Sequence, residues 1–287
     1  MNISILGCGW YGLALAKALI NDGILIKGST TSSEKMEGLA AAGIEPYLVN
    51  FLAGEENYDT DFFNGDVLFI SIPPKSRSGE GVNYISKLQG IINALKQHGV
   101  KNVVYISSTS VYADLNDEVN ENTAPQPNTD SGKLLLEAED LFRVEKTFKT
   151  TIIRFGGLIG PNRDPGRFFV GRKDIPNGNA PVNLIHLDDC IGLSMAIIDK
   201  KAFGYLFNAC SPDHPTRSAF YTQAAIRSNL EVPQFIPELK EWKIVRSVNV
   251  EPVLGYQFKV EKQLSVSTIP LRLPVCPPSQ KLKFRLS

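Results

Sequence analysis

The sequence predicts an α/β fold in which a doubly wound parallel sheet is followed by a small C-terminal substrate-binding lobe. Short apolar runs alternate with segments of helical periodicity as far as Arg154, which is typical of parallel strands joined by crossover helices. A glycine-rich motif, Gly7 to Gly12, directly follows the first apolar run. The chain has 287 residues, which at ~150 residues per domain suggests about two units.

Each predicted strand is a short apolar run that ends at polar or turn-forming residues. These runs are Ile3 to Leu6, Ile24 to Ile26, Ile44 to Val49, Val67 to Ile72, Val103 to Ser107 and Thr150 to Arg154. The predicted helices between them have apolar residues at steps of three or four. They are Trp10 to Ile20, Ser33 to Ala42, Val82 to Leu95 and Leu134 to Phe142, with Gly99 as a cap after the third.

The second half of the chain is less regular, because Gly, Pro, Asn and Arg dominate from Gly156 to Pro181. Two strand-like pieces follow, Val182 to His186 and Tyr205 to Phe207, and helices are expected after Leu187 and near Thr216. We expect residues 1–160 to form the first domain, with its sheet completed by segments near 182–208. Residues 161–256 form the lobe. Residues 257–287 form a basic, proline-containing tail, loosely ordered or a partner-binding arm.

Composition excludes several classes of protein. Lys plus Arg is 30 and Asp plus Glu is 30, so the basic surplus of a nucleic-acid partner is missing. No apolar run reaches the ~18 residues of a membrane span, and no basic leader precedes the first strand. Four cysteines without paired spacing favour neither a disulfide framework nor a metal cluster, so we expect a reducing cytoplasm.

The motif Gly7-Cys8-Gly9-Trp10-Tyr11-Gly12 has the GxGxxG pattern between a strand and a helix. Gly7 permits a tight turn, Gly9 allows the backbone to approach a pyrophosphate, and Gly12 allows the helix to pack on the strand. The helix N-terminus then offers free amides and a positive dipole end to phosphate. We therefore predict a Rossmann-type dinucleotide site that includes all six residues; the alternative is a plain strand-to-helix turn.

The end of the second strand favours NADP over NAD. An NAD site needs a carboxylate there to bind the ribose 2′-hydroxyl. The sequence instead continues with Ser29, Thr30 and Thr31, and no acid appears before Glu34. Hydroxyls with Lys27 and Lys35 nearby would tolerate a 2′-phosphate.

In a doubly wound sheet, ligands bind at the carboxyl ends of the strands. The residues expected there share this position after strands four, five and six. They are Ser71, Ile72 and Pro73, then Ser107 and Ser108, then Phe155 and Gly156. The serine hydroxyls would face a substrate carbinol or carbonyl.

With these motifs the chain resembles the NAD(P)-dependent epimerase/dehydratase branch of the short-chain dehydrogenase/reductase superfamily over about residues 1–256. Ser107 to Tyr112 resembles the SS-x-x-VYG segment, with Ala113 in place of Gly. Phe155 to Pro161 resembles the turn that ends in GP after strand six, and Asn183 to Asp189 resembles the "HvdD" element. The resemblance implies an oxidoreductase that acts on a hydroxyl or carbonyl of a small anionic or nucleotide-linked substrate. It places the catalytic Ser/Thr at Ser108 and suggests a homodimer.

One departure concerns the Tyr-x-x-x-Lys motif of that superfamily. Lys133 matches the lysine, which would hold the nicotinamide ribose, but the tyrosine position is Thr129. An aliphatic hydroxyl is a poor general acid, because one lysine cannot bring its pKa near neutrality as it does for a phenol. Tyr112 and Tyr84 are expected to be structural. The alternative function is therefore a non-catalytic NADP(H)-binding sensor or regulatory protein.

Three further features are open to two interpretations each. Arg163, Arg167 and Arg172 lie in the loop after strand six and are predicted to bind an anionic substrate, unless the loop is simply solvated. His186 beside Asp188 is either a base or, as we favour, part of a turn. Cys8 is expected to be small filler rather than a redox thiol.

Overall fold

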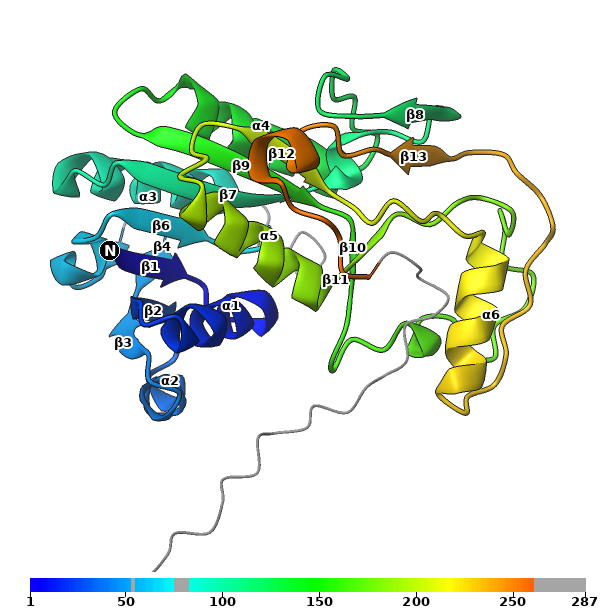
Figure 1. Ribbon diagram of the computed structural model, residues 1–287, viewed down its shortest axis with the longest axis horizontal. Coiled ribbons are helices and arrows are strands. Elements are labelled where there is room, and N and C mark those ends of the chain that lie inside the picture. Colours follow the sequence, from blue (N-terminus) through cyan, green and yellow to red (C-terminus); the bar gives the residue numbers. More distant parts are fainter. Residues whose placement is uncertain (53–54, 75–82, 261–287) are drawn as a thin grey trace, which may run out of the picture.

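A computed structural model describes residues 1–52, 55–74 and 83–260, and it shows a parallel sheet covered by helices (Figure 1). The sheet has seven strands in the order β12-β9-β7-β6-β1-β2-β3, all paired in parallel. In chain order they are β1 (Asn2–Leu6), β2 (Leu25–Thr30), β3 (Glu45–Leu48), β6 (Val67–Ile70), β7 (Asn102–Ser108), β9 (Lys149–Phe155) and β12 (Leu206–Ala209). The predicted Rossmann-type fold is confirmed.

Two hydrophobic cores lie on the two faces of this sheet. Along β6, Leu68 and Ile70 pack into one core while Val67 and Phe69 pack into the other, as alternation along a strand requires. The first core takes in α3 (Tyr84–His98) and α4 (Asp130–Val144), and the second takes in α1 (Trp10–Asn21), α2 (Met36–Ala41) and α5 (Leu187–Asp199). Both faces are therefore buried, which explains why the central strand β6 is apolar at every position.

The order of the strands places the topological switch point beside β1. From β1 the chain builds outward through β2 and β3, and it then returns to the other side of β1 with β6. In open sheets of this kind the crevice at the carboxyl ends of the two central strands receives the ligand. Here that crevice lies next to the glycine loop.

The lobe is made of short pieces paired across long stretches of chain. The strand β10 (Gly157–Ile159) pairs with β11 (Leu184–His186), and β8 (Asp117–Val119) pairs with β13 (Lys243–Val245). Helix α6 (Arg217–Arg227) lies apart from the sheet, at the right of Figure 1. A further hairpin joins β4 (Asn50–Leu52) to β5 (Glu55–Asn57).

Most predicted elements are found, with small shifts of their ends. Gly99 caps α3 in the left-handed conformation at φ 70°, as predicted. The predicted helix 33–42 begins as a 3₁₀ turn, Ser33–Lys35, before α2. The segment near 206 joins the main sheet as β12, but the predicted strand 182–186 does not, because β11 pairs with β10 instead. Val82 and the tail from residue 261 lie outside the described residues.

Among the helices of residues 1–52, 55–74 and 83–260, none has the length and apolar character needed to span a bilayer.

Candidate functional site

The glycine loop is held tightly against the ends of β1, β2 and β6. Gly7 has φ +97°, and its amide donates to Oγ of Ser29 at 2.9 Å. A Cβ on Gly7 would lie 2.8 Å from the carbonyl oxygen of Ser71, and one on Gly12 would collide with the carbonyl oxygen of Gly7. Both glycines are therefore required by the protein's own backbone packing.

Gly9 differs from these two glycines, because no atom lies within 4 Å of the position of a Cβ there. Its φ of −83° is negative, so no left-handed conformation requires glycine there. Gly9 is the N-cap of α1, and the first helical bond runs from the amide of Leu13 to its carbonyl oxygen at 2.9 Å. The amides of Trp10, Tyr11 and Gly12 thus precede the helical bonds, and the first turn holds no acid. The open space at Gly9 thus lies at a helix N-terminus with free amides, the kind of site that binds a pyrophosphate.

Three predicted cofactor residues instead serve the protein's own packing. Ser29 is buried, and its hydroxyl is used by the glycine loop. The hydroxyl of Tyr11 is buried against Oγ of Ser194 at 2.6 Å, so only its backbone can face a ligand. Burial raises the pKa of Cys8 to about 12, so its thiol stays neutral.

The end of β2 carries hydroxyls and no carboxylate. Oγ1 of Thr30 accepts from the amide of Ser32 at 3.1 Å, and Thr31 and Lys35 are exposed. Lys27 does not reach this edge, because its ammonium pairs with Asp61 at 2.7 Å. Its expected contribution to a 2′-phosphate site is therefore wrong.

The ends of β6 and β9 close the crevice with packed backbone. Ser71 donates its amide to the carbonyl oxygen of Leu6 at 2.9 Å, and Ile72 lies against the position of Gly7, while Pro73 is exposed. The ring of Phe155 is buried edge-on to Tyr11, with centroids 5.1 Å apart. The amide of the following residue, Gly156, donates to Ala209 of β12. These predicted residues form walls rather than polar contacts.

Ser107 and Ser108 at the end of β7 have different surroundings. Ser107 is buried and donates to Oε1 of Glu139 at 2.6 Å, so its predicted contact with the cofactor is not available to its hydroxyl. Ser108 is half-buried at the strand end, where its Oγ accepts from the amide of Ser110 at 3.2 Å. Ser108 still has its own proton and a free lone pair to offer a ligand.

Glu139 belongs to a buried ionic network that the sequence did not reveal. Its carboxylate receives two bonds from Arg154, at 2.9 and 2.6 Å, and one from Arg143 at 2.8 Å. Arg154 also donates to the hydroxyl of Tyr112 at 2.5 Å. The pKa of Arg154 is raised by Glu139 despite burial. This network joins α4, β7 and β9, and it includes Ser107, the residue before Ser108.

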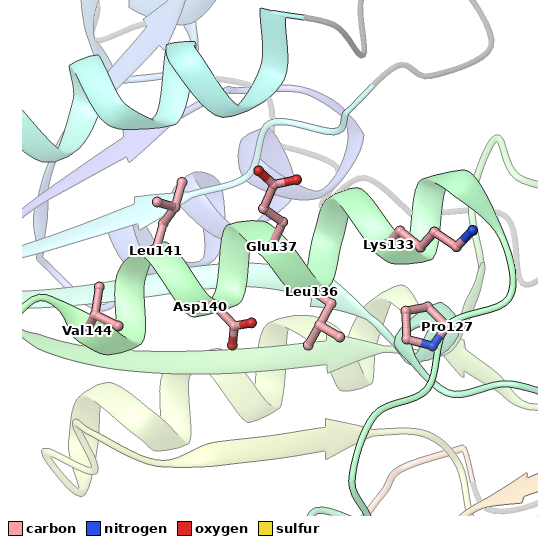
Figure 2. A pocket seen from close by; sticks show the side chains of 7 residues that line it. All are labelled: Pro127, Lys133, Leu136, Glu137, Asp140, Leu141 and Val144. Atoms are coloured by element: carbon pink, nitrogen blue, oxygen red, sulfur yellow. The ribbon is translucent and has the colours of Figure 1, made fainter.

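Thr129 and Lys133 both lie at the start of α4, where their side chains have different surroundings. Thr129 is the N-cap of α4, and its Oγ1 accepts from the amide of Gly132 at 3.1 Å. Gly132 in turn packs against the carbonyl oxygen of Ser110, so the first turn of α4 lies against the segment that follows Ser108. Lys133 is exposed there and lines a groove of about 470 Å³. Figure 2 shows Lys133 beside Pro127 at one end of this groove, with Val144 at the other.

Neither tyrosine near the site is free to replace the missing phenol. The hydroxyl of Tyr84 donates to the carbonyl oxygen of Ile72 at 3.0 Å and lies 2.9 Å from that of Tyr105, and burial raises the pKa of Tyr84 to about 12. Tyr112 donates to the carbonyl oxygen of Asn120 at 2.9 Å while it accepts from Arg154, and burial raises its pKa. Both are structural, as the sequence analysis predicted.

The three arginines of the loop after β9 are separated in the structure. Arg163 stacks on the ring of Trp10, with its guanidinium carbon 4.8 Å from the ring centroid. Arg167 is 79% exposed, with Asp164 at 3.9 Å. Arg172 lies over Phe169 at 5.5 Å, in the lobe. They therefore do not form one substrate-binding cluster.

The "HvdD" element joins sheet, lobe and C-terminal segment. His186 caps α5, and its Nδ1 accepts from the amide of Asp188 at 3.2 Å, so it acts as the turn residue that we favoured. The carboxylate of Asp189 is fully buried and receives three bonds, from the Tyr256 hydroxyl at 2.8 Å and from the amides of Lys259 and Val260 at 2.6 and 3.1 Å. We call these three bonds between Asp189 and residues 256–260 the C-terminal clasp. The sequence analysis missed it, because nothing in the sequence links Asp189 to its distant partners.

The chain is similar in sequence to proteins from two bacteria. No protein-family model matches the chain. Protein YeeZ of Escherichia coli K12 is 36% identical over 265 residues, which cover 90% of this chain and 96% of YeeZ. The uncharacterized UDP-glucose epimerase YtcB of Bacillus subtilis is 26% identical over 156 residues, which cover 47% of this chain and 49% of YtcB.

Solved structures share the whole fold. A functionally unknown conserved protein from Silicibacter pomeroyi is 25% identical with a TM-score of 0.74, covering 92% of this chain and 95% of that one. The UDP-glucuronic acid 4-epimerase from Bacillus cereus, solved in complex with NAD, is 19% identical with a TM-score of 0.75 over the same shares of the two chains. At this identity the likeness shows a common fold.

Proposed function

The chain belongs to the family of Escherichia coli YeeZ and has the fold of the NAD-dependent epimerases and dehydratases, and from this premise we propose that it is an NAD(P)-binding oxidoreductase of the epimerase/dehydratase type. Its substrate is a small molecule with a hydroxyl or carbonyl group, nucleotide-linked or otherwise anionic. The UDP-sugar epimerases among the similar structures support the nucleotide-linked class.

The observation that carries this proposal is the difference among the three glycines of the loop. Gly7 and Gly12 are required by contacts within the protein, whereas the Cβ position of Gly9 faces open space at the N-terminus of α1. A turn that served folding alone would not need glycine at Gly9. A pyrophosphate that approaches the backbone there would need it.

The chemistry assigned to the chain's own residues is orientation rather than proton transfer. When bound, the nicotinamide cofactor supplies the hydride exchange with a substrate carbon. Ser108 orients the substrate oxygen by hydrogen bonding, and Lys133, on the adjacent first turn of α4, contacts the nicotinamide ribose. Thr129 is given no role in proton transfer, because its aliphatic hydroxyl is a poor general acid.

We further propose that NADP is preferred over NAD. The end of β2 presents Thr30 and Thr31, and no carboxylate precedes Glu34, so a 2′-phosphate would meet hydroxyls there, with Lys35 on the following turn. The UDP-glucuronic acid 4-epimerase structure that this chain resembles holds NAD, which supports a nicotinamide dinucleotide as the cofactor. The preference for NADP rests on the residues at the end of β2.

The homodimer suggested by the family resemblance stays a prediction.

Titration of the purified protein with NADPH and NADH, followed by nicotinamide fluorescence, tests the proposal. We expect NADPH to bind at micromolar concentration and NADH more weakly. Gly9→Ala should lower the free energy of unfolding by no more than about 1 kcal/mol, the cost of a poorer N-cap residue. It should nevertheless bind at least about tenfold more weakly, a loss equal to ~1.4 kcal/mol. If the parent binds neither dinucleotide at millimolar concentration, the motif is only a turn. Binding without turnover of any hydroxyl or carbonyl substrate would identify the sensor instead.

A further inference from the structure

A tight turn after β10 fastens to the glycine loop. The amide of Arg163 donates to the carbonyl oxygen of Gly160 at 2.9 Å, with Pro161 and Asn162 between them. Asn162 has φ 61°, and proline followed by a left-handed asparagine is the pattern that a type II turn favours. The turn therefore holds Arg163 in a defined backbone position.

Two contacts fix this turn against the two helices that begin beside it. Nε1 of Trp10, the first residue of α1, donates to the carbonyl oxygen of Pro161 at 2.7 Å. On the other side, a Cβ on Gly160 would lie 3.1 Å from Cβ of Leu187, the first residue of α5, so only glycine fits there without displacing the helix. The turn is thus placed between the N-termini of α1 and α5 before any ligand arrives.

Arg163 is the charged group that this turn presents to α1. Its guanidinium carbon lies 4.8 Å from the centroid of the Trp10 ring, which orients the guanidinium without neutralising it. Within residues 1–52, 55–74 and 83–260, Arg163 has no ion-pair partner, whereas Arg154 and Arg246 are each paired with a glutamate. The first turn of α1 also holds no acid that could pair with it.

We infer that Arg163 binds the pyrophosphate of the dinucleotide, together with the amides at the N-terminus of α1, and does not bind the substrate. This inference rests on the proposed function, because it concerns the same cofactor. The planar guanidinium offers two parallel N–H groups to a phosphate, and its stacking on Trp10 reduces the side-chain freedom lost on binding. Under this inference Arg163 contacts the cofactor rather than the substrate that the sequence analysis predicted for it. Arg163 then has a different role from Arg167 and Arg172.

The test compares Arg163→Met with Arg167→Met, a matched removal of one cation from the same loop. Arg167 is 79% exposed and its guanidinium is 3.9 Å from Asp164, so its loss should not change dinucleotide affinity. Arg163→Met should weaken NADH and NADPH equally, by about tenfold, because both carry the pyrophosphate. The dependence of affinity on salt should also become weaker in Arg163→Met, which loss of a purely structural contact would not cause. Unfolding temperatures of the two variants should agree.

The affinities of the parent protein and of the two variants distinguish failure of the Arg163 inference from failure of the proposed function. Equal affinity of Arg163→Met and Arg167→Met overturns the inference and leaves the proposed function standing. A loss for NADPH but not NADH also overturns it, because Arg163 would then read the 2′-phosphate. Failure of the parent protein to bind either dinucleotide overturns the proposed function itself, before any variant is compared.

Discussion

Replacing Arg154 by Met should destabilise the fold strongly, because it leaves the carboxylate of Glu139 buried without its main partner. Arg154 and Glu139 are 1% and 0% exposed, and two hydrogen bonds of 2.9 and 2.6 Å join them. Breaking a buried ion pair from one side costs ~3–5 kcal/mol. Ser107 and Arg143 keep their bonds to Glu139, so we expect the lower end, about 3 kcal/mol of unfolding free energy.

The assay is urea unfolding at neutral pH, with a surface pair of the same chemistry as the control. Arg246 binds Glu118 through two bonds, at 3.0 and 2.6 Å, but these side chains are 42% and 51% exposed. Arg246→Met should therefore cost less than about 1 kcal/mol. The double variant Arg154→Met with Glu139→Leu should recover most of the loss, since no unpaired charge remains buried.

The reasoning would be refuted by either of two results. The first is a cost for Arg154→Met no larger than that for the surface variant Arg246→Met. The second is a double variant whose loss equals the sum of the two single losses, because the pair would then carry no coupling energy.

Three further predictions concern packing, protonation and the C-terminal clasp. Gly12→Ala should lower the unfolding free energy by ~1–3 kcal/mol, because its Cβ collides with the backbone of Gly7; an unchanged thermal midpoint would contradict this. Burial lowers the pKa of His214 below 6.5, so the unfolded chain takes up the proton first, and the free energy of unfolding should fall as the pH decreases through 6.5 toward the folded pKa. His214→Gln should remove that portion of the slope in urea unfolding at pH 7.5 and 5.5, and an unaltered slope would assign it to other groups. Asp189→Asn should accelerate tryptic cleavage after Lys259, whose amide Asp189 binds; equal digestion rates would show that the clasp does not order this segment.

The main sheet could be predicted because its information is local. Each strand is a run of apolar residues, and each crossover helix carries its own periodicity, so neither depends on distant partners. The strands β8 and β13 have three residues each and pair across more than 120 residues of chain, so no local pattern marks them. The same limit hid Asp189 and its bonds to residues 256–260.

Within the site, the sequence predicted which strand ends meet but not which way each side chain faces. Ser107 and Ser108 are neighbours, yet one is bound into the core by Glu139 and the other caps a 3₁₀ turn, because adjacent strand residues face opposite sides. Lys27 was expected near the ribose on sequence distance alone, whereas its position in β2 directs it to Asp61. Local sequence distance therefore identifies candidates, and strand alternation decides among them.

The structure gives Thr129, which occupies the tyrosine position of the Tyr-x-x-x-Lys motif, a role as the N-cap of α4. A threonine at an N-cap stabilises a helix by about 1 kcal/mol through the bond that its Oγ1 accepts, and here that bond comes from Gly132. This bond leaves the hydroxyl its own proton, but an aliphatic hydroxyl is a poor general acid, because one lysine cannot bring its pKa near neutrality. Position 129 thus contributes to folding, and Lys133 remains exposed on the first turn of α4 without a phenol to activate. If the chain reduces or epimerises a substrate, we expect its own residues to orient groups around the nicotinamide, and we expect Gly9 and Arg163 to bind the phosphate end of the cofactor.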